Sequence, residues 1–117
     1  MTELNKQFLF TRFTADLIVY AYQNGFQVTF GEAWRSPETC ELYAKAGKGI
    51  SNSLHRRRLA IDLNLFKDGK YLTDLASYKI LGDYWKSLSG LGYECAWGGD
   101  FKSQDANHFS IENLGVR

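Results

Sequence analysis

Hydrophobic residues recur at three- and four-residue intervals along the first 25 positions of the chain. The four that define one helical face are Leu9, Phe13, Leu17 and Tyr20. This spacing is typical of an amphipathic helix that packs on a core. Thr2 is a suitable N-cap, and Asn24-Gly25 tolerates the left-handed backbone with which many helices end. We therefore predict a helix from Glu3 to about Gly25.

Alternation of apolar and polar residues, or a short apolar run between turn signals, predicts β-strands elsewhere. The predicted strands are Gln27 to Trp34, Leu59 to Leu65, Tyr93 to Trp97 and His108 to Ile111. The clearest alternation begins at Leu59, and it directs the Leu and Ile side chains to the core and Ala60, Asp62 and Asn64 to the opposite face. Asp68-Gly69 then provides a hairpin-type turn signal.

Two more helices are predicted from their capping residues. Ser36-Pro37-Glu38 is a strong helix start, so a helix should run from Pro37 to about Ala46 and end at Gly47. Thr73 or Asp74 should cap a third helix that runs to about Leu88. The polar segment from Gly47 to Arg58 lacks periodicity and is predicted to be a loop. The whole chain, 1–117, should form one α+β domain with a small mixed or antiparallel sheet packed against about three helices.

Composition excludes several classes of function. Fourteen Lys and Arg against thirteen Asp and Glu give a net charge of +1, so a nucleic-acid partner or a nuclease activity is not expected. No segment is apolar enough for stable membrane insertion, and the first residues lack the features of a secretory signal, so we expect synthesis in the cytoplasm. The local run Arg56-Arg57-Arg58 is left without an assigned role.

The two cysteines and two of the tryptophans are interpreted as structural. Cys40 and Cys95 form no CxxC pair, so buried free thiols are expected, although a disulfide between them stays open. Trp34 and Trp97 are expected to pack in the protein and not to stack on sugars.

Both histidines of the chain lie close to a carboxylate in a loop or at a strand end. His55 precedes Asp62 by seven residues, and Asp105 precedes His108 by three. Two imidazoles and one carboxylate are the three-ligand set typical of catalytic zinc, which leaves a fourth position open. We expect His55, Asp62 and His108 to bind one Zn²⁺ per chain, with Asp105 as the general base.

A single histidine is more often a structural residue than a metal ligand, and Asp62 alone would be read as a solvent-facing residue of the sheet. These readings do not explain why each carboxylate has a histidine nearby. The repeated pairing favours a metal site.

Three segments of the chain resemble motifs of the zinc D-alanyl-D-alanine carboxypeptidase and L-alanyl-D-glutamate peptidase family. The segment from Ser53 to Asp62 is similar to the motif S-x-H-x-x-G-x-A-x-D, and the segment from Trp97 to Phe109 is similar to the second metal motif. Trp34-Arg35-Ser36-Pro37 resembles the upstream arginine motif. The resemblance implies a Hedgehog-like, D-Ala-D-Ala peptidase-like fold, and it implies His55, Asp62 and His108 as ligands and Asp105 as base.

The resemblance also implies roles for two further residues. Arg35 should face the cleft and bind a substrate carboxylate or the oxyanion, and Ser53 should orient His55 or the substrate. The family glycine is Arg58 here, so we expect the loop to run differently at this point. An Asp before the second His, with Phe109 after it, looks closest to the bacteriophage endolysin branch.

The endolysin resemblance implies a monomer that cuts the L-alanyl-D-glutamate bond of peptidoglycan stem peptides. Such an enzyme would accumulate in the host cytoplasm and reach the periplasm after a separate protein permeabilises the membrane. Two alternatives stay open: a D-alanyl-D-alanine carboxypeptidase or dipeptidase with the same site, and a non-catalytic, metal-stabilised module that binds the cell envelope.

Overall fold

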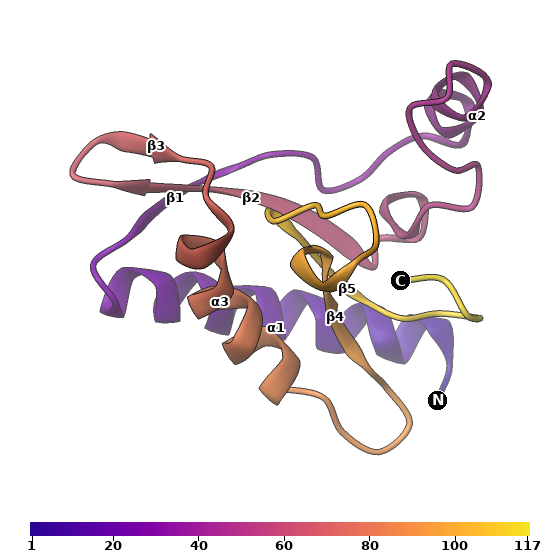
Figure 1. Cartoon of the computed structure of the whole chain (residues 1–117). Helices are drawn as coiled ribbons and strands as arrows, with labels where there is room; N and C mark the ends of the chain where they lie inside the picture. The colour runs from indigo at the N-terminus through magenta and orange to yellow at the C-terminus, as the bar shows by residue number, and fades with distance from the viewer.

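The computed structural model describes residues 1–117 and contains three α-helices and five strands, all paired antiparallel (Figure 1). The predicted α+β class is therefore confirmed. In chain order the elements are α1 (Glu3–Gln23), β1 (Gln27–Phe30), α2 (Pro37–Lys45), the short 3-10 helix η1 (Leu54–Arg57), β2 (Ala60–Lys67), β3 (Lys70–Leu72), α3 (Leu75–Ser87), β4 (Cys95–Trp97), the 3-10 helix η2 (Gly98–Asp100) and β5 (His108–Ile111).

Strand β2 organises the sheet because three other strands pair with it. The strand order is β1-β2-β5-β4, and β3 pairs with the C-terminal end of β2. The register places Asp62 opposite His108 across β2 and β5, and Phe30 opposite Leu63 across β1 and β2. The predicted alternation is confirmed from Ile61 onward, although Ala60, predicted on the opposite face, is also buried. The predicted core-facing residues are at most 5% exposed: Leu59 just before β2, and Ile61, Leu63 and Leu65 within it.

An aromatic cluster centred on Trp85 joins the helices to the sheet. Helices α1 and α3 lie together on one side of the strands, while α2 stands apart from them (Figure 1). The Trp85 ring meets Phe10 and Phe109 edge-on at centroid distances of 5.7 and 6.0 Å. Its indole N–H donates to the Ser110 carbonyl at 2.9 Å. This buried hydrogen bond satisfies the polar atom of a side chain that is otherwise surrounded by apolar groups.

The predicted helix caps are confirmed by the hydrogen bonds at each start. The Thr2 hydroxyl accepts from the Asn5 amide at 3.1 Å, the Ser36 hydroxyl accepts from the Thr39 amide at 3.1 Å, and the Asp74 carboxylate accepts from the Ser77 amide at 2.9 Å. Both cysteines are free and buried, as expected. None of the helices combines the length and hydropathy that crossing a bilayer requires.

Three local predictions were incomplete or wrong. Strand β1 ends at Phe30 and not at Trp34, because Gly31 and Glu32 both oppose Asp62 in the manner of a β-bulge. The predicted 47–58 loop contains η1, and β3 follows the Asp68-Gly69 turn although no strand was predicted there. At three residues, β3 is too short to show an alternation.

Gly82 lets α3 approach the sheet, and its replacement by alanine should destabilise the protein. A Cβ atom at this position would lie 2.2 Å from the Trp97 ring. Overpacking costs about 1–3 kcal/mol, which exceeds the gain of about 1 kcal/mol in helix propensity. We expect Gly82→Ala to lower the urea midpoint; an unchanged or higher midpoint would contradict this packing.

Candidate metal centre

Two candidate ligands are neighbours across the sheet. Asp62 in β2 lies directly opposite His108, the first residue of β5. Side chains at directly opposed positions of an antiparallel pair project from the same face. The Asp62 Oδ1 atom is 3.5 Å from His108 Nδ1. The strand register therefore brings together residues that are far apart in the sequence.

The third candidate ligand comes from η1. The Ser53 hydroxyl accepts a hydrogen bond from the His55 amide at 3.2 Å and so fixes the start of this short helix. His55 Nε2 lies 3.4 Å from Asp62 Oδ1. Ligand atoms of His55, Asp62 and His108 all lie within 4.8 Å of one another.

The spacing of these atoms suits a metal ion better than direct hydrogen bonds. Asp62 Oδ1 is buried and has no hydrogen-bond partner, since both nitrogens lie beyond the usual range of about 2.7–3.2 Å. A tetrahedral zinc with bonds of about 2.1 Å separates its donor atoms by about 3.4 Å. The donor types and two of the separations therefore fit a zinc site with one position left for a further ligand.

The segment between β1 and α2 holds two of the ligands in place. Gly31 N–H donates to the Asp62 carbonyl at 2.7 Å, and Asp62 N–H donates to the Glu32 carbonyl at 2.9 Å. The Ala33 carbonyl lies 3.2 Å from His55 Nδ1 and can only accept, so Nδ1 carries the proton and Nε2 keeps its lone pair. The backbone of Ala33 therefore selects the tautomer of His55 that can bind a metal.

The electrostatics of the three groups are dominated by their mutual pairing. Burial opposes protonation of His55, but Asp62 and the Ala33 carbonyl outweigh burial and raise the pKa of His55 above its ordinary value of 6.5. Burial would raise the pKa of Asp62, but the nearby His108 and His55 rings outweigh burial and lower this pKa to about 2. Asp62 is therefore a carboxylate throughout the physiological range.

Asp105 lies beside the candidate ligands without belonging to the compact group of three. Its Oδ2 atom is 3.9 Å from His108 Nδ1, and its side chain is half-exposed. Burial and the charge of Asp62 raise its pKa, while His108 acts in the opposite direction. The turn that carries Asp105 rests on Gly98, where a Cβ atom would lie 2.1 Å from the Asp105 carbonyl oxygen. A side chain at position 98 would thus displace the candidate base.

Arg35 lies on the wall of the same cleft, as predicted. Its guanidinium is paired with the Glu32 carboxylate and lies 4.8 Å from the centre of the Tyr43 ring. The side chain is only 14% exposed, so these contacts leave it little freedom. Its positive charge partly opposes the rise in the pKa of Asp105 that burial causes, so the guanidinium is within electrostatic reach of the candidate base.

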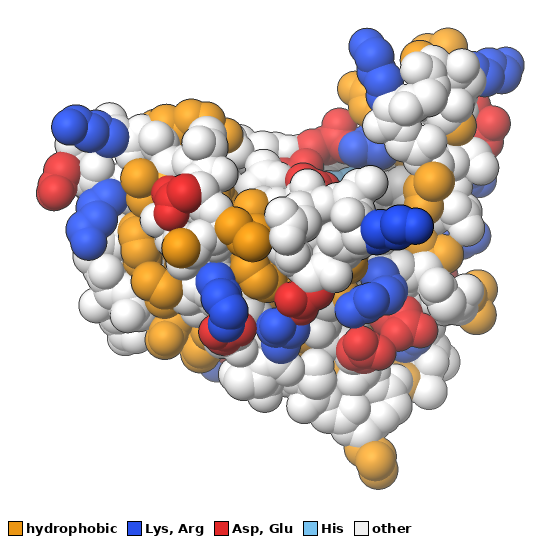
Figure 2. All heavy atoms as spheres, in the orientation of Figure 1, with side chains coloured by type: hydrophobic (Ala, Val, Ile, Leu, Met, Phe, Trp, Pro, Cys, Tyr) orange, Lys and Arg blue, Asp and Glu red, His pale blue; other side chains and the backbone are white.

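The cleft has a volume of about 190 Å³ and a polar lining. Figure 2 shows a hollow beside the projecting α2, with acidic, basic and histidine side chains at its base. Its lining includes all the predicted site residues together with two cations that were not predicted to take part: His55, Asp62, His108, Asp105, Arg35, Ser53, Lys48 and Arg117.

The arginine run does not form one cationic patch, because each side chain has a different partner. Arg56 lies 3.9 Å from Glu41 and donates to the Ser51 carbonyl at 3.3 Å. Arg57 lies 3.7 Å from Glu3 of α1. The first two arginines therefore have separate partners within the chain, on different elements.

Arg58 adopts the left-handed conformation that glycine favours, with φ 57° and ψ 36°. Its guanidinium lies 5.0 Å from the centre of the Trp34 ring. The expectation that Trp34 packs inside the protein is wrong, since this residue is 48% exposed and supports Arg58 at the surface. Trp97, at 2% exposed, packs in the core as expected.

A two-histidine, one-carboxylate set with a position left open is typical of the catalytic centres of metallohydrolases. The family model described as D-alanyl-D-alanine carboxypeptidase matches residues 46–111, which include all three candidate ligands and Asp105 but not Arg35. Because the match covers more than half of the chain, this protein belongs to that family of peptidoglycan-acting peptidases.

Comparison with solved structures supports the same fold. The crystal structure of the Serratia marcescens L-Ala D-Glu endopeptidase ChiX matches with a TM-score of 0.65 and 20% sequence identity. The match covers 84% of this chain and 77% of the endopeptidase. No curated protein sequence gives a significant match.

Metal affinity should fall in mild acid because protons compete for His55. The metal requires the neutral imidazole, and the pKa of His55 lies above 6.5 in the metal-free protein. Below that pKa, the affinity for zinc should fall about tenfold per pH unit for this one proton. Chelator competition between pH 5 and 8 measures this slope, and a constant affinity would exclude His55 as a ligand.

Glycine should be better tolerated than alanine at position 58. Both Arg58→Gly and Arg58→Ala lose the contact with Trp34, but only alanine retains the cost of a left-handed backbone, about 1–2 kcal/mol. Urea unfolding of the two metal-free variants should show Arg58→Gly to be more stable by about 1 kcal/mol. An equal or more stable Arg58→Ala would contradict the observed backbone conformation.

Proposed function

We propose that the protein is a zinc peptidase that hydrolyses the L-alanyl-D-glutamate bond of peptidoglycan stem peptides. The observation that carries this proposal is the meeting of His55, Asp62 and His108 within 4.8 Å, with Asp105 beside them in a polar cleft. Zinc held by these three residues would supply Lewis acidity to activate water and polarise the scissile carbonyl.

The remaining chemistry belongs to side chains of the cleft. Asp105 takes the proton of the attacking water, and its raised pKa brings it closer to that of an effective general base. Arg35 presents a guanidinium, oriented by Glu32, to a substrate carboxylate or to the developing oxyanion. Ser53 acts on the site indirectly, because its hydroxyl holds the His55 amide.

The choice of bond is supported by two kinds of likeness. Phe109 after the second histidine and Asp105 before it resemble the endolysin branch, and the similar solved structure is described as an L-Ala D-Glu endopeptidase. The description of the family favours a second candidate with the same site, a D-alanyl-D-alanine carboxypeptidase.

A metal-stabilised binding module is less well supported. A structural zinc site usually has four protein ligands, whereas three meet here. The arginines that such a module would use to hold an anionic surface instead have separate partners within the chain.

As an endolysin of a bacteriophage, the protein would be made in the host cytoplasm. It would act as a monomer on the wall in the periplasm, after a separate protein has permeabilised the membrane. Its role would then be degradation of the host wall at lysis.

Asp105→Asn should abolish turnover and leave the zinc in place. Loss of a general base costs about 10²–10⁴-fold in rate, and Asp105 is not among the three candidate ligands. Turbidity loss of purified sacculi measures the rate, and metal analysis measures the zinc content. Asp100→Asn is the matched control, because Asp100 is not among the residues that line the cleft and pairs instead with Lys86. Undiminished lysis by Asp105→Asn would refute the assignment of the base.

Mass spectrometry of digested muropeptides should identify the bond. Cleavage between L-Ala and D-Glu separates the stem from the glycan-linked alanine, whereas carboxypeptidase action removes a terminal D-Ala. We expect the first pattern of masses. Exclusive loss of D-Ala would instead establish the carboxypeptidase.

A further inference from the structure

Arg117 is a cation of the cleft wall that the chemistry described so far does not use. It lines the same cleft as the three candidate ligands. Its guanidinium lies 5.4 Å from the centre of the Phe101 ring, and that ring lies 5.4 Å from the His108 ring. Contacts from Arg117 to Phe101 and from Phe101 to His108, whose rings are tilted by 55°, therefore link the wall of the cleft to the metal centre.

A tight turn brings Arg117 back toward the cleft. Asn113 and Val116 exchange two backbone hydrogen bonds of 3.0 and 2.9 Å, and the two residues between them have positive φ angles. Leu114 has φ 51° and Gly115 has φ 79°, which is the pattern of a type I′ turn. The chain direction is thus reversed within four residues.

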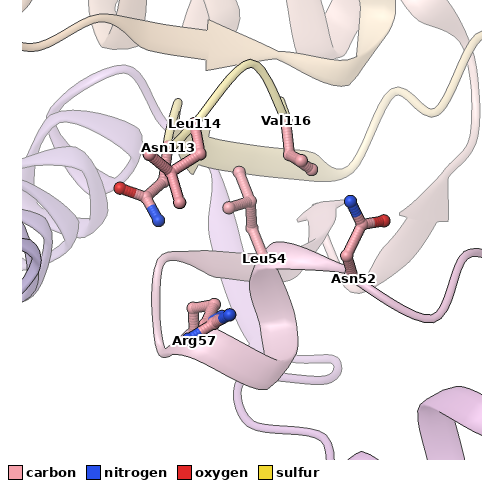
Figure 3. Close-up of a pocket in the computed structure, with 6 residues that line it drawn as sticks. All are labelled: Asn52, Leu54, Arg57, Asn113, Leu114 and Val116. Carbon is pink, nitrogen blue, oxygen red and sulfur yellow. The ribbon is translucent and has the colours of Figure 1, made fainter.

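Side chains from two other elements anchor this turn. The buried Asn113 amide donates to Glu3 at 2.8 Å and accepts from Lys6 at 3.3 Å, so α1 holds the first residue of the turn. Figure 3 shows Leu54 of η1 pointing toward Leu114 and Val116. Because Leu54 precedes His55, the segment that carries a candidate ligand also supports the turn.

The guanidinium of Arg117 keeps capacity for a further partner. Its closest carboxylate oxygen belongs to Glu94 at 3.9 Å, and both side chains are about half-exposed. Such an exposed pair contributes little to stability, so a substrate can displace it at low cost. Arg35, by contrast, is held by Glu32 and Tyr43 close to the candidate base.

The charge of the cleft favours an anionic peptide. Its lining carries three cations, Arg35, Lys48 and Arg117, of which Arg35 is already paired with Glu32, and two carboxylates, Asp62 and Asp105. Asp62 is paired with the histidines and would be neutralised further by a metal ion, which leaves Asp105 as the one carboxylate free to face the substrate. The Arg117 guanidinium meets His108 only through the Phe101 ring, so it is offered to a part of the peptide away from the metal ligands.

We propose that Arg117 determines substrate specificity by binding a carboxylate of the peptide outside the scissile bond. This inference rests on the proposed function, because it assumes that a stem peptide occupies the cleft. Phe101 sets the position of the guanidinium, and the anchored turn limits the freedom of the backbone that carries it. The preferred substrate is then a peptide with free carboxyl groups, and its amidated form is a poor one.

Kinetics with a matched pair of peptides test this role. The probes are a stem peptide that contains L-Ala-D-Glu with free carboxyl groups and the same peptide with those groups converted to amides. Wild-type zinc-loaded enzyme should prefer the acid form in kcat/KM, mainly through KM. Arg117→Gln should lose about fivefold of that preference, as expected for a partly exposed charge pair of about 1 kcal/mol.

Two control variants separate specific binding from a general change of charge or fold. Lys70→Gln removes the same charge from the exposed strand β3, and it should keep the full preference for the acid form. Arg117→Lys should restore part of the preference lost in Arg117→Gln. Equal acid-to-amide ratios in wild type and Arg117→Gln would overturn the inference, as would an equal loss on both peptides.

Failure of the proposed function gives a different result. If wild type cleaves neither peptide, the proposed activity falls, and calorimetric binding of the same two peptides to the zinc-loaded protein then tests Arg117. A loss of the acid preference in Arg117→Gln but not in Lys70→Gln supports the carboxylate contact without cleavage. Equal affinity ratios in all three proteins overturn it.

Discussion

The pairing of β2 with β5 is the interaction on which the candidate site depends. It sets Asp62 directly opposite His108, and backbone hydrogen bonds with Gly31 and Glu32 hold the same Asp62 from the other edge of β2. A shift of one residue in this register would turn one ligand toward the core and the other toward the cleft. The hydrophobic alternation of β2 prevents such a shift, because it would expose four buried aliphatic side chains.

Regular elements of this fold could be predicted from local sequence because their signals are local. The first helix shows both its apolar face and its Thr2 cap, and β2 shows a clean alternation from Leu59 onward. The three candidate ligands could be selected because each histidine has a nearby carboxylate. Their convergence could not be derived from periodicity, since the pairing of Asp62 with His108 is a long-range contact between segments with no shared pattern.

The parts that sequence reasoning missed share a dependence on tertiary contacts. The early end of β1 follows from the way Gly31 and Glu32 oppose a residue of β2, which no window around Phe30 reveals. Arg117 reaches the cleft wall only because α1 and η1 hold the turn that precedes it. A Leu-Gly turn lacks the Asn-Gly or Asp-Gly signature, so its type I′ geometry could not be predicted from the local sequence.

The bulge at Gly31 and Glu32 has a consequence for how such a domain can diversify. Because strand pairing and the backbone of Gly31 and Glu32 fix Asp62 and His108, connecting loops other than the β1–α2 segment can change in length and composition without moving these two residues. Insertion of a single residue inside β2 or β5 has no such freedom, since it would reverse the facing of every residue that follows it in the strand. New peptide preferences are therefore expected to arise in the segments around the cleft, such as the loop with Lys48 and the turn before Arg117, while the sheet stays constant.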